Sequence, residues 1–261
     1  MMKKSIFFAV ALLCGASLFA QEQETENPIS AERPGAGSGT SVLAKKVFQI
    51  ETGAQYQEFE FGNVKQKYWT YNTTLLRYGL LDNFEIRLSW DAQEIKTEVS
   101  GNEINDVMAG FTPLTAGFKI GIVEEKGILP QMAFIGNLFL PFAAATDFKS
   151  ENTGGQMLLT FSNTLDAQSG ITYNLGAQWS GDSSELSYVY AFSYGRSLVG
   201  DLSGFAEVYG TLPEDNQGQN SWDAGLSYLI SNDFQVDASA GTGFDTDQNF
   251  FVNAGVSYRF N

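Results

Sequence analysis

The chain contains no histidine and one cysteine, Cys14, among its 261 residues. Histidine is the usual general base that activates serine or water in hydrolases and acyltransferases, so its absence removes most nucleophilic mechanisms. A single cysteine cannot form an internal disulfide, and the fold therefore depends on backbone pairing and burial. Pairs of Asp and Glu remain available for acid–base chemistry, but no pair stands out. We expect a protein that is not an enzyme, with no catalytic residue, no metal site and no cofactor.

Basic residues are also scarce. The chain has 15 Lys and Arg against 30 Asp and Glu, which gives a formal net charge of −15 at pH 7. A surface of this charge repels a phosphate backbone, so we expect no nucleic-acid partner. Beyond the N-terminal region, the chain has no apolar run of the ~20 residues that a membrane helix requires. A membrane-crossing version of this chain would therefore have to use β-strands.

The N-terminus has the three parts of a secretory signal peptide. Lys3 and Lys4 form a positive region, residues 6–13 form an apolar region, and residues 16–20 form a stretch that contains small side chains. This order of charge, apolar core and small residues is typical of a signal that is removed after export. We therefore expect residues 1–20 to be a signal peptide.

Two other features bear on the organisation of the N-terminal region. Cys14 raises lipid attachment as an alternative, but the bulky Leu13 precedes it where such a site has a small residue. Residues 21–46 are rich in Glu, Pro, Gly and Ser without any period, which predicts a periplasmic N-terminal segment. Residues 47–261 then form the main domain.

Residues 250–260 alternate with a period of two residues, which is typical of a β-strand. Aliphatic and aromatic side chains occupy the even positions, and polar ones occupy most of the odd positions. We expect an interior face with Asn253, Ser257 and Arg259 and a lipid face with Val252, Val256 and Tyr258. Apolar residues outside and polar residues inside, with an aromatic residue near the C-terminus, are typical of a transmembrane β-barrel.

Segments of the same kind succeed one another along the chain, about twelve in all, an even number as bacterial single-chain barrels require. They are residues 47–59, 68–78, 84–90, 107–122, 128–140, 156–165, 171–179, 186–198, 203–210, 222–230, 234–242 and 250–260. Short turns are expected near Asp82, Glu125, Ala167, Gly200 and Asn232, and longer loops near Asn63, Val99, Ala145, Gly181, Asn216 and Thr246. The sequence therefore predicts an all-β fold, a transmembrane antiparallel β-barrel of about 12 strands with both termini in the periplasm.

One predicted strand, residues 68–78, breaks the alternation. Trp69 and Arg77 have the same parity, although a membrane-facing Trp and an interior Arg belong on opposite faces. We expect either a β-bulge between them or a strand that begins after Trp69.

Charged residues recur at positions that face the predicted interior. An Arg or Lys on the lipid face near the bilayer midplane costs about 2 to 4 kcal/mol, so these side chains belong inside. They are Arg77, Arg87, Lys119 and Arg259, together with Glu51, Glu85, Glu207, Asp223 and Asp237. Two interpretations are open: a charge network that fills a narrow barrel, or a polar constriction that selects a permeant molecule. Arg77, Glu85 and Arg87 should meet near the periplasmic end.

Several short segments carry a family resemblance. They are residues 29–35 (ISAERPG), 75–80 (LLRYGL), 84–87 (FEIR), 205–207 (FAE) and 258–260 (YRF). With them the chain resembles the outer-membrane β-barrel family of transporters labelled for the meta-pathway of phenol degradation, over most of the exported chain. The resemblance implies a barrel that passes small, aromatic or apolar molecules, and it brings no catalytic residues. The positions that match the family's charged positions are Arg77, Glu85, Arg87 and Glu207.

The family's frequent Asp-Arg-Pro appears here as Glu32-Arg33-Pro34, and we expect Arg33 to narrow the periplasmic mouth of the barrel. The function that follows is a passive channel or facilitator for small-molecule solutes in the outer membrane of a Gram-negative-type bacterium. Its other partners are then outer-membrane lipid and lipopolysaccharide. The alternative is a closed structural or surface-interaction barrel without transport, and a soluble β-sandwich is a third interpretation.

Overall fold

The computed structural model describes residues 27–183 and 185–260. The expected signal peptide, residues 1–20, lies outside the described residues. The secondary structure is β, apart from two short 3-10 turns, η2 (Pro141–Ala143) and η3 (Thr146–Phe148). Among the described residues, no helix is both long and apolar enough to cross a membrane.

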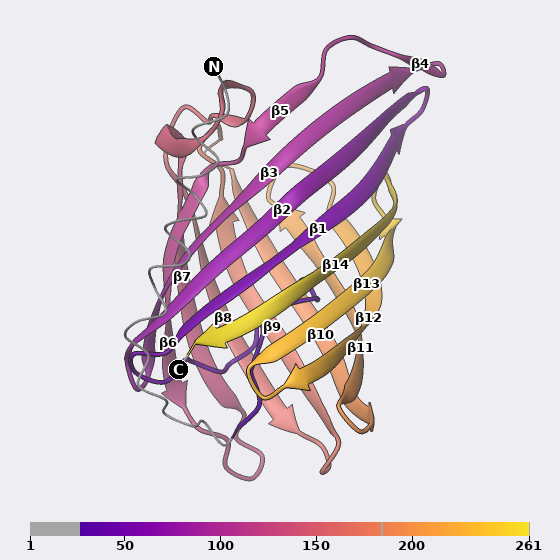
Figure 1. The fold of residues 1–261 in the computed structure, drawn as a ribbon. Helices are drawn as coiled ribbons and strands as arrows, with labels where there is room; N and C mark the ends of the chain where they lie inside the picture. The colour runs from indigo at the N-terminus through magenta and orange to yellow at the C-terminus, as the bar shows by residue number, and fades with distance from the viewer. Residues whose placement is uncertain (1–26, 184, 261) are drawn as a thin grey trace, which may run out of the picture.

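The strands form a 14-stranded antiparallel sheet that closes on itself (Figure 1). They are β1 (Phe48–Phe61), β2 (Val64–Leu81), β3 (Phe84–Val99), β4 (Asn102–Glu103), β5 (Met108–Phe111), β6 (Leu114–Val123), β7 (Gln131–Leu140), β8 (Gly154–Thr164), β9 (Ser169–Trp179), β10 (Leu186–Val199), β11 (Leu202–Pro213), β12 (Gln219–Ser231), β13 (Phe234–Asp245) and β14 (Gln248–Phe260). Pairing of β1 with both β14 and β2, and of β2 with β3, closes the barrel. The short strands β4 and β5 lie against β3, and the other strands form the wall. The prediction of an all-β antiparallel barrel of about 12 strands is confirmed.

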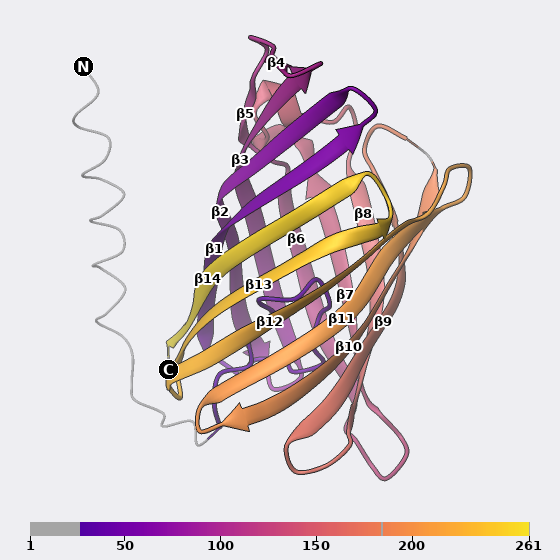
Figure 2. The ribbon, with the colours of Figure 1, turned by 90° about the vertical axis from the view of Figure 1, so that its right-hand side faces the viewer.

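We call the end of the barrel where β1 begins and β14 ends the terminal end, and the opposite end the distal end (Figure 2). Two connections that were expected to be long loops are tight turns at the distal end: Gly62 and Asn63 join β1 to β2, and residues 246–247 join β13 to β14. The connection expected near Val99 is long, and it begins with a two-residue turn, Ser100 and Gly101, between β3 and β4. Gly62, Ser100 and Gly101 have positive φ values of 63°, 51° and 81°, as two-residue hairpin turns require. The expectation of long loops between β1 and β2 and between β13 and β14 is wrong because polar residues continue these strands beyond the apolar band.

Prolines set two strand boundaries that differ from the expected ones. The expected strand 107–122 is divided into β5 and β6, with Thr112 and Pro113 between them. Similarly, β7 begins at Gln131, directly after Pro130, rather than at residue 128. Proline has no N–H to donate to a strand ladder, so Pro113 and Pro130 fall outside the paired segments.

A β-bulge at Tyr71 explains the broken alternation in β2. In the pairing of β2 with β3, Tyr71 is an extra residue without a partner. The inserted residue reverses the parity of the strand. Trp69 is therefore 42% exposed on the outside, whereas Arg77 is 1% exposed on the inside.

The alternation predicted for the last strand is confirmed in β14. Ser257 and Arg259 are 0% and 8% exposed, whereas Val252 and Tyr258 are 44% and 41% exposed. Asn253 also points inward, since its amide oxygen accepts a hydrogen bond from a residue of the N-terminal segment inside the barrel. The wall thus presents apolar side chains outside and polar ones inside.

Residues 27–46 lie inside the barrel as a loop (Figure 2), and we call them the inner segment. The chain enters at the terminal end, where the N–H of Ile29 donates to the turn between β12 and β13. It reverses at residues 35–39, which we call the apex, and returns to the terminal end, where the N–H of Lys46 donates to Gly79 O at 2.7 Å. This part of the expected periplasmic segment therefore lies in the lumen, enclosed by the barrel wall.

Candidate channel lumen

Charged side chains of β1, β2 and β3 meet inside the barrel, near its terminal end, as one cluster. Arg77 binds Glu85 through two parallel hydrogen bonds, from Nε to Oε1 and from NH2 to Oε2, both of 2.9 Å. Its NH1 atom lies 3.1 Å from Glu51 Oε1. Arg87 Nε lies 3.8 Å from Glu85 Oε1. All four side chains are buried, so each charge depends on its partners and the loss of one would leave another unpaired.

Glu32 of the inner segment completes this cluster. Its Oε1 accepts a hydrogen bond from Lys119 Nζ on β6 at 2.5 Å, and its Oε2 lies 3.4 Å from Arg87 NH2. Burial alone would raise the pKa of the Glu32 carboxyl, but Lys119, Arg87 and Arg77 together lower it well below its usual range. The cluster then balances three acidic against three basic groups. We call these six residues the ion cluster.

The ion cluster also binds the backbone of the inner segment. Arg77 NH1 donates to Ser30 O at 2.8 Å, and Arg77 NH2 donates to Ser41 O at 3.1 Å. Lys119 Nζ donates to Gly39 O at 2.9 Å. A buried segment without strand partners has to satisfy its N–H and C=O groups in another way. Side chains of the barrel wall take that role here.

The apex is held at the opposite wall, on β9 and β11. The Glu207 carboxylate accepts hydrogen bonds from the N–H groups of Ala36 and Gly37. The Asn174 amide accepts from the N–H of Ser38 at 2.7 Å and donates to its C=O at 2.8 Å. Because the inner segment is bound to both walls, it spans the lumen.

Arg33, the residue expected at the mouth, lies deeper in the barrel, against β1, β2, β13 and β14. Its guanidinium lies 3.0 Å from Asp237 and donates a hydrogen bond of 3.1 Å to Thr73 Oγ1. It also lies against the backbone at Gly53 and Gly255, where an added Cβ atom would collide with it. An added Cβ would also collide with a backbone carbonyl oxygen, Ala254 O at Gly53 and Thr52 O at Gly255, so glycine is required at both strand positions.

The remaining predicted lumen residues lie outside the ion cluster. Glu207 and Asp223 stand opposite each other on β11 and β12, and no described Lys or Arg forms an ion pair with either. Arg259 pairs with Asp233 at 2.6 Å, at the terminal end. The structure therefore gathers five of the nine predicted lumen charges in the ion cluster and distributes the other four over the wall. Their role in selecting a solute stays a prediction.

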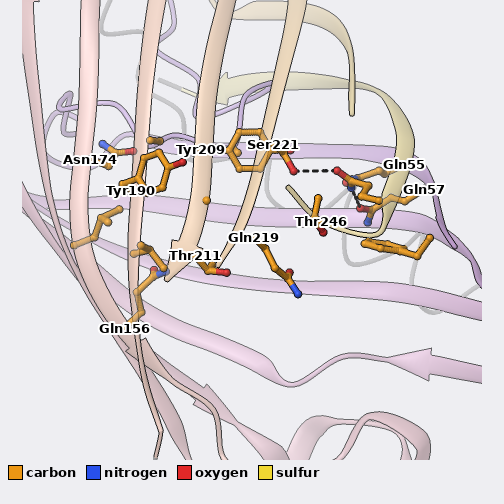
Figure 3. A pocket seen from close by; sticks show the side chains of 17 residues that line it. Gln55, Gln57, Gln156, Asn174, Tyr190, Tyr209, Thr211, Gln219, Ser221 and Thr246 are labelled. Carbon is orange, nitrogen blue, oxygen red and sulfur yellow. Dashed lines mark hydrogen bonds between the residues drawn. The ribbon is translucent and has the colours of Figure 1, made fainter. Parts of the chain in front are cut away.

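Two of the cavities inside the barrel lie on either side of the apex. The distal cavity has a volume of about 410 Å³ and is lined by Ala36 (Figure 3). The terminal cavity has a volume of about 520 Å³ and is lined by Gly37. Asn174 and Ala191 line both cavities. The two spaces are therefore separated by little more than the backbone of the apex.

The sequence does not predict which residues bind the inner segment. In the sequence, Glu32 belongs to the stretch that resembles the family, and residues 21–46 have no period from which the charged partners of Glu32 could be predicted. Asn174 and Thr160 are uncharged residues at inward positions of β9 and β8, and Thr160 Oγ1 donates to Ser38 O at 2.6 Å. Their inward parity was the available signal, but it does not distinguish them from other polar lumen residues.

A closed antiparallel barrel with an apolar outer face and a polar lumen defines an outer-membrane β-barrel protein. The chain belongs to the family described as "Putative MetA-pathway of phenol degradation", whose model matches residues 31–260. No curated protein sequence matches the chain.

The fold is similar to that of several solved outer-membrane barrels. An outer membrane channel from Pseudomonas putida F1 superimposes with a TM-score of 0.66 at 13% identity, covering 87% of this chain and 99% of that one. The KdgM porin gives a TM-score of 0.53 at 10% identity and covers 82% and 99% of the two chains. The translocator domain of the autotransporter NalP from Neisseria meningitidis gives 0.51 at 13% identity, with 84% and 90% covered. At these identities the similarity establishes the fold.

Proposed function

We propose that the protein is a passive channel or facilitator for small molecules, with the inner segment as its constriction. The observation that carries this proposal is the pair of cavities inside one barrel, separated by the apex. A barrel built only as a structural element does not need two open spaces that almost meet. The family description and the names of the similar barrels, a channel and a porin, support the same function. Aromatic compounds are candidate solutes through the family description.

The proposal includes an orientation and a processing step. Residues 1–20 are removed as a signal peptide, and the inner segment, residues 27–46, enters the barrel from the periplasmic side. Both strand termini lie at the terminal end and the long connection of residues 141–153 lies at the distal end, which matches the short periplasmic turns and longer outer loops of outer-membrane barrels. The distal end, with its acidic connections, faces the outside.

A closed structural barrel is the second candidate, and the ion cluster favours it because five buried charges and the half-buried Glu32 fill part of the lumen. Conductance in planar bilayers separates the two functions. Deletion of residues 21–40 removes the apex and should raise the conductance. Deletion of residues 21–26 is the matched control, because it leaves every contact described above in place. If neither form conducts or admits a small solute into liposomes, the channel proposal fails.

A further inference from the structure

The distal cavity has a lining unlike the rest of the lumen. None of its lining residues is charged, whereas the terminal cavity is lined by Glu32, Arg33, Glu125, Arg196 and Glu207 among others. Amides are the most frequent polar side chains of the lining, and they are Gln55, Gln57, Gln156, Asn174, Gln219 and Gln248. Figure 3 shows amide, hydroxyl and tyrosine side chains from several strands around one space.

These groups keep hydrogen-bonding capacity that the protein does not use. Gln248 Nε2 donates to Gln57 Oε1 at 2.9 Å, and Ser221 Oγ donates to Gln248 Oε1 at 3.2 Å. Gln55 and Gln219 make no side-chain hydrogen bond within the described part of the chain. Because each amide carries two donor hydrogens and an acceptor oxygen, the wall offers both kinds of partner around the cavity.

Apolar surfaces interrupt this polar lining. Phe59, Leu158, Val189 and the ring of Tyr209 also border the cavity. A sugar ring has a rim of hydroxyl groups and two faces of C–H groups, so it matches a wall of amides with apolar patches between them. A volume of about 410 Å³ is within the range of small-molecule sites. We propose that the distal cavity binds an uncharged polyhydroxylated solute of the size of a mono- or disaccharide.

This proposal rests on the proposed channel function and names its solute class. An ionised solute would lose hydration in the cavity without meeting an opposite charge. A simple phenol carries one hydroxyl group, so its ring would displace water from several amides and leave them without partners. A polyol replaces that water with its own donors and acceptors. The cavity therefore discriminates by charge and by the number of hydroxyl groups.

Equilibrium binding to the full chain in detergent tests the solute class. Saturation-transfer difference NMR is measured with glucose, maltose, glucuronate, glucosamine at pH 6, and phenol. We expect signals from glucose or maltose about tenfold stronger than those from the two charged sugars, because charge burial is unfavourable there. Equal signals from the charged sugars overturn the proposal. A phenol signal that depends on the cavity, without a sugar signal, also overturns it.

Variants place the binding in the distal cavity. Gln57→Leu and Gln248→Leu should weaken the glucose signal about two- to tenfold, because each removes a neutral hydrogen-bonding group. Gln93→Leu is the matched control, since Gln93 contacts Thr70 and does not line the cavity. Thr211→Val, a smaller change in the lining, replaces any variant that loses the heat-dependent gel shift of a folded barrel. An equal loss of signal in the control and cavity variants overturns the assignment.

Liposome swelling with the same sugars tests the channel function separately. Binding of glucose without entry into liposomes overturns the channel and supports the solute class. Entry of neutral and charged sugars at equal rates, without binding, overturns the solute class and supports the channel.

Discussion

The two sides of the lumen solve the problem of a polar interior differently. On the side of β1, β2, β3 and β6, six charged groups lie within ion-pair distance of one another and hold the ends of the inner segment. Around the distal cavity, β8 to β12 together with Gln55 and Gln57 of β1 and Gln248 of β14 present uncharged amides and hydroxyls. Buried charges have to be neutralised by direct contact, which favours a filled interior. Neutral polar groups can exchange partners with water, so they tolerate an open space.

The comparison indicates where a solute would pass. The terminal and distal cavities are both bordered by β9 and β10 through Asn174 and Ala191 and almost meet at the apex. The cavities that border β3 and β6 do not share these residues. We infer that the path follows the β8 to β12 side and is interrupted by the apex. Arg77, Glu85 and Arg87 then act mainly by stabilising the barrel and its inner segment.

Removal of an ion-cluster residue should give the largest effect. Arg77→Ala leaves Glu51 and Glu85 buried without their main partner, so the free energy of unfolding should fall by about 3 to 5 kcal/mol. Urea unfolding in lipid vesicles measures this change. Arg196→Ala is the control, because Arg196 is exposed and its ion pair with Asp166 is 4.0 Å long, so its effect should stay within about 0.5 kcal/mol. Altered ion selectivity at unchanged stability would instead identify Arg77 as a filter residue.

A charge placed on the outer face should have the next largest effect. Val256→Arg replaces an outward residue of β14, and the free energy of folding into vesicles should become less favourable by about 2 to 4 kcal/mol if the site lies near the midplane. Val256→Leu keeps the face apolar and should fold like the native chain. Equal folding of both variants would contradict the orientation of β14.

The barrel could be predicted because a two-residue period sets the face of every strand residue before any tertiary contact is known. Ser257 and Val252 fall on opposite faces for that reason alone. A bulge in β2 could be predicted because Trp69 and Arg77 have the same parity but belong on opposite faces, and the structure places it at Tyr71. The inner segment was not, because residues 27–46 have no period, and the contacts of Glu32 depend on long-range pairing that sequence spacing does not encode.

Release of the apex should change transport more than stability. Glu207→Gln retains the shape of the side chain but replaces one acceptor oxygen by a donor, so the hydrogen bonds to Ala36 and Gly37 are weakened. Loss of hydrogen bonds to a charged group is worth about 1.5 to 3 kcal/mol, which should raise the open fraction about tenfold or more. Single-channel recordings measure this open fraction, which is the fraction of time that the channel conducts.

Asp223→Asn is the matched control for this prediction. Asp223 stands opposite Glu207 in the β11–β12 ladder and makes no described hydrogen bond to the inner segment, so the open fraction should stay unchanged. If Asp223→Asn raises the open fraction as much as Glu207→Gln does, then the charge of the Glu207–Asp223 pair governs opening. The hydrogen bonds between Glu207 and the apex would then not govern it.

The smallest effect concerns acid, and it tests the charged side of the comparison through Glu32. The pKa of Glu32 lies below its ordinary value of 4.5 in the folded protein, because three cations outweigh the effect of burial. The stabilisation is therefore complete above the unfolded pKa and is lost as the pH falls towards the folded pKa. The urea midpoint of the native chain minus that of Glu32→Gln should be constant between pH 7 and 6 and should shrink between pH 5 and 3. The difference cancels other carboxylates that titrate in the same range. A difference in urea midpoint that does not change with pH would show that the cations around Glu32 do not stabilise its carboxylate. The ion pairs of Glu32 would then not hold the inner segment to the ion cluster.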